Sequence, residues 1–221
     1  MAVVKTCETL RKKICERGAE YLGCSPDDVE FDGEKVVNLK TKEEITRKEI
    51  GNKVMCSSNA PLSATEAFSS PVSPPPFMVG IAEVEIDKET GVVEPIDYAA
   101  VVDCGTVVNP NLARVQTEGG IAQGIGMALY EDIIYSEKGK NYSNSFMQYK
   151  IPSRLDVGEI RVEFESSYEP TGPFGAKSIG EIVINTPSPA LAHAVFNATG
   201  LWIRELPITS EKIVMGLLEK E

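Results

Sequence analysis

A single glutamate in this 221-residue sequence has a setting well suited to acid–base chemistry. Glu181 lies between a segment of small residues, 172–180, and the apolar run 182–184. Burial raises the pKa of a carboxylate because the charged form loses its hydration, so a buried Glu181 would be a competent proton acceptor near neutral pH. Two structural roles are also open: an ion pair with Lys177, or a cap on the helix predicted to start near Pro187. The pattern alone favours a structural role.

A second candidate, Gln123, lies in a glycine-rich stretch of a predicted helix. Four of the eight residues from 119 to 126 are glycines, and each glycine inside a helix costs ~1 kcal/mol relative to alanine. Such glycines allow close backbone approach, to another element or to a ligand, and Gln123 offers both a donor and an acceptor. The spacing differs from the G-x-G-x-x-G dinucleotide fingerprint. The pattern alone favours tight helix packing over ligand contact.

Two other residues with reactive side chains have weaker settings. Cys104 has no histidine placed to activate its thiol, so we expect a buried structural cysteine. His193, the single histidine, lies on an apolar predicted helix, where a satisfied core or surface histidine is expected. The five cysteines lack C-x-x-C spacing, which argues against a zinc site and is typical of reduced thiols. With one histidine, a metal held by a cluster of histidines is excluded within this chain.

Composition and charge exclude several classes of protein. A chain that is 42% hydrophobic and 25% charged is an ordinary globular domain and not a disordered one. The formal net charge of -11 leaves no basic stripe for nucleic acid. No apolar run approaches the roughly 18 residues of a membrane helix, and the N-terminus lacks the apolar core of a signal peptide. We expect a cytoplasmic protein that binds neither nucleic acid nor membrane.

The elements that must position these residues follow from hydrophobic spacing and from turn residues. Helices are predicted over residues 3–21, 42–51, 112–130, 187–198 and 210–218. Strands are predicted over residues 29–31, 35–39, 81–86, 92–102 and 159–167. The strands at 81–86 and 92–102 flank a turn and form an antiparallel hairpin. Strands and helices are mixed without βα alternation, which indicates an α+β fold.

A long loop separates two parts of the chain. Residues 57–76 contain five prolines and six serines, and loops of this length are unusual inside compact domains. The segment is either a linker between domains or a stretch that lies across a partner surface. We divide the chain into an N-terminal helix with short strands (1–56), a proline- and serine-rich loop (57–79) and a C-terminal segment (80–221).

Five motifs occur together in a recognisable order. They are Glu83–Asp87 with Thr90-Gly91, Asp103-Cys104-Gly105 with Asn109-Pro110, Glu118–Glu131, Tyr149–Pro152, and Gly175–Glu181. This series resembles the C-terminal part of the molybdenum-binding subunit in the xanthine dehydrogenase/aldehyde oxidase family. The resemblance is strong over residues 80–221 and looser over 1–60. Cys104 stands where many relatives have an aliphatic residue, which we interpret as a neutral packing change.

The resemblance implies a role for each candidate residue. Glu181 falls on the catalytic base beside molybdenum, and Gln123, with Gly124, falls on the motif that contacts the pyranopterin cofactor. The fold it implies is the C-terminal portion of a molybdopterin-binding domain. The cofactor would be molybdenum-pyranopterin, either plain or in the cytosine dinucleotide form. An N-heterocycle or an aldehyde would be hydroxylated with oxygen from water, and electrons would pass to 2Fe-2S clusters and FAD on partner subunits.

The family's molybdenum subunit is much longer than this chain. The resemblance therefore predicts one piece of a split subunit, or a truncated product, that cannot enclose the cofactor alone. The expected partners are the remaining molybdenum-subunit chain, an iron–sulfur subunit and an FAD subunit. The alternative is a non-catalytic structural or assembly fragment of such a subunit.

Overall fold

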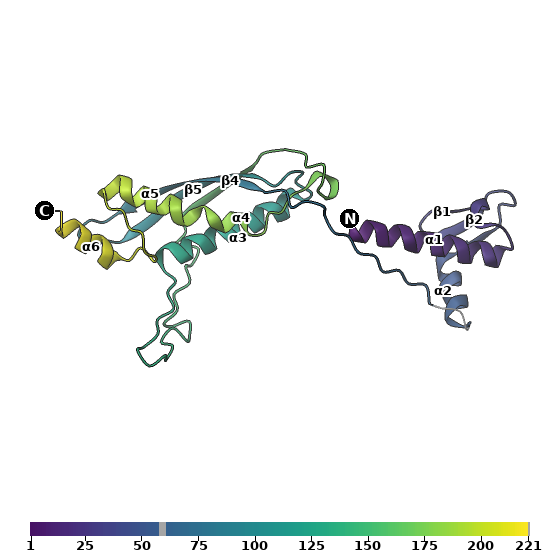
Figure 1. Ribbon diagram of the computed structural model, residues 1–221, viewed down its shortest axis with the longest axis horizontal. Coiled ribbons are helices and arrows are strands. Elements are labelled where there is room, and N and C mark those ends of the chain that lie inside the picture. The colour runs from purple at the N-terminus through teal and green to yellow at the C-terminus, as the bar shows by residue number, and fades with distance from the viewer. Residues whose placement is uncertain (58–60, 221) are drawn as a thin grey trace. The chain divides into compact units, whose positions relative to one another are not determined.

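The computed structural model describes residues 1–57 and 61–220, and the chain divides into two compact units (Figure 1). The first unit is Met1–Ser70 and the second is Pro71–Glu221. Each unit combines helices with a three-stranded sheet. The predicted α+β class is therefore confirmed, and the division between the units falls inside the proline- and serine-rich loop.

The first unit is a helix packed on a small antiparallel sheet. Helix α1 (Ala2–Leu22) precedes a short 3-10 turn, η1 (Pro26–Asp28), and the strands β1 (Val29–Phe31), β2 (Lys35–Asn38) and β3 (Glu44–Thr46). The strands pair in the order β1-β2-β3. Helix, sheet and a second helix share one core, formed by Ile14, Phe31, Val36, Ile45, Ile50 and Val54.

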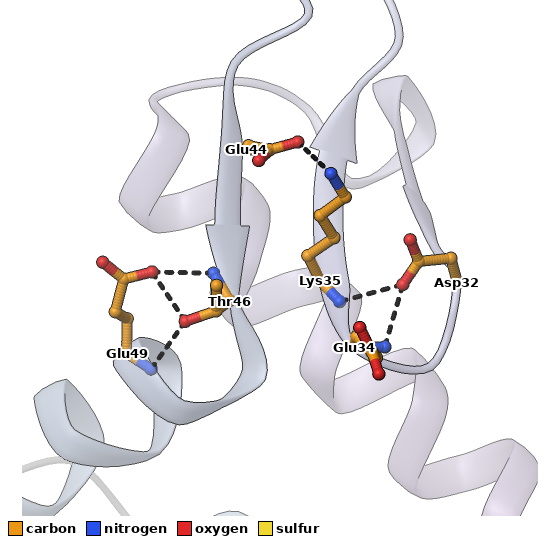
Figure 2. A network of polar contacts seen from close by, with 6 residues as sticks. All are labelled: Asp32, Glu34, Lys35, Glu44, Thr46 and Glu49. Atoms are coloured by element: carbon orange, nitrogen blue, oxygen red, sulfur yellow. Dashed lines mark hydrogen bonds and ion pairs between the residues drawn. The ribbon is translucent and has the colours of Figure 1, made fainter.

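The helix predicted over residues 42–51 is wrong at its start. Glu44–Thr46 form strand β3 because Ile45 is buried between two exposed neighbours, and helix α2 (Arg47–Met55) begins only afterwards. Thr46 and Glu49 form a capping box, in which the Glu49 N–H donates to Thr46 Oγ1 at 3.2 Å and the Thr46 N–H donates to Glu49 Oε2 at 2.9 Å (Figure 2). These bonds satisfy N–H groups that would otherwise be unpaired at the start of α2.

An ion pair and two turn hydrogen bonds connect the strands of the first unit. Lys35 on β2 pairs with Glu44 on β3 (Figure 2). In the turn between β1 and β2, Asp32 Oδ1 accepts the N–H groups of Glu34 at 2.8 Å and of Lys35 at 2.9 Å. The strands predicted over residues 29–31 and 35–39 are therefore confirmed, and they pair antiparallel, with β2 ending at Asn38.

The described part of the long loop lies partly on the first unit. Residues 58–60 of the predicted loop lie outside the described residues. Leu62 packs against the core of the first unit, and Lys13 Nζ on α1 donates to the Ser63 carbonyl at 2.6 Å. Ser63 of this loop therefore contacts α1, and the boundary between the units follows at Ser70.

The second unit is a mixed sheet with helices on its inner face. Strands β4 (Phe77–Ile86) and β5 (Val93–Asp103) form the predicted antiparallel hairpin, and β6 (Glu159–Phe164) pairs parallel to β5. Figure 1 shows the helices α3 (Pro110–Leu129), α4 (Ile182–Asn185) and α5 (Pro187–Thr199) along the sheet, with α6 (Ser210–Leu218) at the C-terminal end. The core gathers residues from sheet and helices, including Tyr98, Ala100, Ile121, Ile125, Leu191, Val195 and Ile213.

The outer face of this sheet is apolar and exposed. β4 begins at Phe77, earlier than the predicted Ile81, because the alternation of side chains continues through Val79. The side chains of Phe77, Val79 and Ile81 are 61%, 66% and 68% exposed. On the same face, Arg161 of β6 forms a two-pronged contact with Asp97 of β5. An apolar patch of this kind is typical of a surface that contacts another protein part.

A long excursion separates α3 from β6. Residues 131–157 contain no helix or strand, and an isolated bridge joins Tyr135 to Asn141. Figure 1 shows this segment projecting from the end of α3. Both ends of the excursion are tied to the core, since Leu129 and Val157 belong to the same buried cluster.

Candidate functional site

The two candidate residues of the sequence lie in one groove. Gln123 on α3 and Glu181 at the start of α4 both line an open groove of about 480 Å³. Its walls are one face of α3 and the turn into α4, with lining residues Val115, Gln116, Gly119, Gly120, Gln123, Gly180, Glu181, Ile184 and Asn185. The groove therefore presents an amide and a carboxylate from segments far apart in the sequence.

Helix α3 fixes Gln123. The helix begins where Asn109 Oδ1 accepts the Leu112 N–H at 3.1 Å, with Pro110 in its first turn. Ile121 and Ile125 are fully buried, so Gln123 between them faces outward. Among the residues that the structure describes, the Gln123 amide makes no hydrogen bond. Its donor and its acceptor are both free for a ligand.

The glycines of α3 have two different roles. A Cβ on Gly120 would stand 2.1 Å from Val183 Cγ2, and one on Gly124 would stand 2.6 Å from Pro187 Cγ. Here α3 approaches α4 and α5 more closely than any side chain allows. A Cβ on Gly119, by contrast, would meet nothing within 4 Å. The packing role predicted from the sequence is therefore confirmed at Gly120 and Gly124, while Gly119 and Gln123 face the groove. Gly124 is buried and does not line it.

Neither structural role predicted for Glu181 is present. Glu181 occupies the cap position of α4 but makes no side-chain capping bond, and α5 is preceded by Thr186. Lys177 is paired with Asp103. Within residues 1–57 and 61–220, the Glu181 carboxylate makes no hydrogen bond or ion pair. Glu181 is not buried in this chain, because its side chain is exposed at the rim of the groove.

Lys177, four residues before Glu181, forms a nearly buried ion pair with Asp103. Lys177 Nζ donates to Asp103 Oδ2 at 2.6 Å, and the Lys177 side chain is 8% exposed. Asp103 Oδ1 also accepts from Ser167 Oγ at 2.6 Å and from the Gly105 N–H at 3.0 Å. These bonds, with that of Lys177 the largest contribution, lower the pKa of Asp103 from 3.8 to about 2. The Asp103 carboxyl group is therefore ionised at neutral pH.

Cys104 and His193 have the settings that the sequence predicts. Cys104 is 4% exposed, and burial raises the pKa of its thiol. His193 is an exposed residue, with its ring edge-on to Trp202 at a centroid distance of 5.0 Å. Both predictions are confirmed.

Sequence reasoning missed two residues near the site. Gln116 lines the groove, and its Nε2 donates to the Gly180 carbonyl at 3.2 Å. Its separation from Gln123 is two helical turns, so helical periodicity alone could have placed both on one face. Asn185 lines the groove from the end of α4 and has no comparable sequence signal.

The described part of the chain contains neither a metal-binding cluster nor a membrane-spanning helix. No group of three or more His, Cys, Asp or Glu side chains in residues 1–57 and 61–220 is arranged to hold a metal ion. In the same residues, none of the helices combines the length and the apolar character that crossing a membrane requires.

The second unit combines a mixed sheet backed by helices with an open groove, where an amide and a carboxylate have no partner among the described residues. Such a groove is suited to a polar ligand. Comparison with known families makes this specific. The chain belongs to the molybdopterin cofactor-binding domain family, whose sequence model matches residues 1–158. Gln123 and Gly124 fall inside the matched range, and Glu181 falls beyond it. The resemblance to molybdenum-binding subunits is thereby confirmed.

Named relatives are longer proteins. A probable hypoxanthine oxidase of Escherichia coli K12 is 36% identical over 215 residues, which are 95% of this chain and 22% of the relative. The gamma subunit of the 6-hydroxypseudooxynicotine dehydrogenase complex of Paenarthrobacter nicotinovorans is 30% identical over 221 residues, or 96% of this chain and 28% of that subunit. The chain thus spans about a quarter of the length of these curated relatives.

Solved structures share the fold. Quinoline 2-oxidoreductase from Pseudomonas putida 86 matches with a TM-score of 0.70 and 28% identity, over 96% of this chain and 28% of its own. The aldehyde oxidoreductase from Desulfovibrio gigas matches with a TM-score of 0.60 and 30% identity, over 65% of this chain and 15% of its own. The predicted fold, a portion of a molybdopterin-binding domain, is confirmed.

Proposed function

We propose that this chain supplies the proton acceptor and part of the cofactor-binding surface of a molybdenum hydroxylase. Glu181 is the base, and Gln123 holds the pyranopterin. The observation that carries the proposal is the groove itself, where both side chains lie with no partner among the described residues. Polar groups without a partner at a groove are expected where a ligand will supply one.

The groove has the chemistry that a pyranopterin requires. A pterin ring has an edge of alternating hydrogen-bond donors and acceptors, and the Gln123 amide matches such an edge with one of each. Gly119 and Gly180 line the groove and carry no side chains. A Cβ at either position would meet nothing within 4 Å, so the wall is open there. Gly124 supports the contact from behind, because its close packing on Pro187 fixes the turn of α3 that carries Gln123.

Glu181 then has one chemical task. When bound, the molybdenum group supplies the two-electron oxidation. The Glu181 carboxylate accepts a proton beside it, which is worth typically ~10²–10⁴-fold in rate. Because Glu181 is exposed in this chain, water must be excluded by another protein part. The proposed partners are the remaining molybdenum-subunit chain, an iron–sulfur subunit and an FAD subunit.

The substrate class follows from the relatives and is part of the proposal. Their names refer to hypoxanthine, to quinoline and to an aldehyde. We propose an N-heterocycle or an aldehyde, hydroxylated with oxygen from water. The cofactor is molybdopterin, plain or in its cytosine dinucleotide form, and mass spectrometry of the released cofactor distinguishes the two.

The experiment is a Glu181→Gln substitution in the complex assembled by co-expression with the genes of the partner chains. The change keeps the size of the side chain and removes the proton acceptor, so turnover should fall by at least ~10²-fold. Molybdenum and pterin contents should stay at the wild-type level. Glu211→Gln, the same chemical change at an exposed position on α6, is the matched control and should leave turnover unchanged.

The two functional alternatives give different results. A fully loaded Glu181→Gln enzyme with normal turnover would show that Glu181 is not the base. A complex that assembles and is active without this chain would instead identify the chain as a structural or assembly fragment.

A further inference from the structure

We propose that Lys177 is a positioning residue for Glu181. Held by Asp103 at the end of β5, it fixes the turn from which Glu181 enters the groove. The inference rests on the proposed role of Glu181 as base, and it concerns a residue that has no contact with the groove wall that Glu181 and Gln123 form.

Burial and additional hydrogen bonds stabilise the ion pair between Lys177 and Asp103. Lys177 is almost fully buried, and a buried ammonium group requires a partner. Asp103 is that partner, and its carboxylate is itself held by Ser167 and by the Gly105 N–H. With three donors on two oxygens, the carboxylate has little freedom to turn away. A surface ion pair would not define a position in this way.

Backbone bonds extend the attachment on both sides of Lys177. The Lys177 N–H donates to the Cys104 carbonyl at 2.7 Å, and the Thr106 N–H donates to the Gly175 carbonyl at 2.8 Å. The approach is close enough that a Cβ on Gly105 would stand 2.3 Å from the Gly175 oxygen. The end of β5 and the segment leading to Glu181 are therefore joined as a short antiparallel bridge.

The segment from Lys177 to Glu181 is also attached near Glu181. Gln116 Nε2 on α3 donates to the carbonyl of Gly180, which belongs to the peptide group that enters Glu181. Three residues thus connect the Lys177 anchor to Glu181, and the last of them is tied to the helix that carries Gln123. Because the Glu181 side chain has no partner among the described residues, its placement depends on these backbone anchors.

The kinetic test uses Lys177→Ala in the assembled, cofactor-loaded complex. If Lys177 acts through Glu181, kcat should fall roughly 10- to 100-fold, as for a misplaced catalytic group, while KM and molybdenum content stay constant. In a Glu181→Gln background the same substitution should cost nothing further, because the group that it positions is already disabled. Lys177→Arg, which keeps the charge, should restore most of the rate.

A second readout needs neither cofactor nor activity. Hydrogen exchange of the chain alone should show the amides of Thr106 and Lys177 exchanging at least ~10-fold faster in Lys177→Ala than in wild type. Arg161→Ala is the matched control. It removes the pair with Asp97 on the same strand β5, and should leave exchange at Thr106 and Lys177 unchanged.

The outcomes separate the inference from the function on which it rests. Unchanged exchange in Lys177→Ala, or a loss of rate that adds fully to that of Glu181→Gln, overturns the positioning role. Normal turnover of Glu181→Gln overturns the proposed function, whatever the exchange data show. Should Lys177→Ala fail to fold, Gln116→Ala at an exposed position replaces it. That variant should lower kcat several-fold without changing KM, and a normal kcat would count against the inference.

Discussion

Two identical substitutions at adjacent positions of α3 test how the groove helix is held. Gly120→Ala places a methyl group 2.1 Å from Val183 Cγ2, whereas Gly119→Ala places one where nothing lies within 4 Å. Val183 is fully buried and β-branched, so it has little room to move. We expect the first substitution to destabilise the second unit and the adjacent one to stabilise it.

The magnitude follows from two terms. Alanine is better than glycine in a helix by ~1 kcal/mol, and this gain is the same at both positions. Overpacking a closed contact costs typically ~1–3 kcal/mol and applies only at Gly120. The propensity gain cancels in the comparison. The free energy of unfolding of Gly120→Ala should therefore be lower than that of Gly119→Ala by ~1–3 kcal/mol.

Urea denaturation followed by tryptophan fluorescence is the assay. Trp202 is the single tryptophan of the sequence and stacks on Phe196 in the second unit, so its signal reports that unit alone. Linear extrapolation of each transition gives the free energy of unfolding. If the two variants agree within ~0.5 kcal/mol, the close approach of α3 and α4 is not what the glycine at position 120 provides.

Three further predictions concern the site, the pH response and the exposed surface. In the assembled enzyme, Gln123→Ala should lower cofactor occupancy or activity without changing the unfolding midpoint; unchanged molybdenum content and unchanged turnover together would contradict the assignment. Folding lowers the pKa of Asp103 from 3.8 to about 2, so the ionised carboxylate stabilises the fold above pH 3.8. This contribution is lost as the pH falls towards 2. The free energy of unfolding should therefore decline less steeply over that pH range in Asp103→Asn than in wild type. The sheet face of Phe77, Val79 and Ile81 should make the isolated chain bind an apolar fluorescent dye or self-associate, and a dye-silent monomer would contradict this.

Elements with a strong local signal could be predicted from the sequence. The long helices and the β4–β5 hairpin follow from hydrophobic spacing, because periodicity over ten or more residues is hard to produce by chance. β3 was missed because three residues carry too little pattern and its only buried side chain is Ile45. The parallel partner of β5 was also beyond local reasoning, since β6 reaches its place only after α3 and the long excursion.

In the site, too, local patterns predict some features, and contacts between distant residues determine the others. An ion pair with Lys177 is one of the two structural roles that the sequence leaves open for Glu181. The segment between them is not helical, so the lysine turns instead to Asp103, which is distant in sequence. That Gln123 and Glu181 share a groove was implied by a family resemblance and not by spacing, because the approach of α3 to α4 depends on tertiary packing at Gly120.

The excursion between α3 and β6 gives this fold freedom to evolve. Its ends are anchored in the core at Leu129 and Val157, while the residues between form no helix or strand. Doubling the length of a flexible loop costs only ~0.6 kcal/mol. Residues can therefore be added to or removed from this segment while Gln123 and Glu181 keep their separation, since neither is attached to it. A longer or shorter excursion would thus keep the groove geometry and change only the surface offered to neighbouring protein parts.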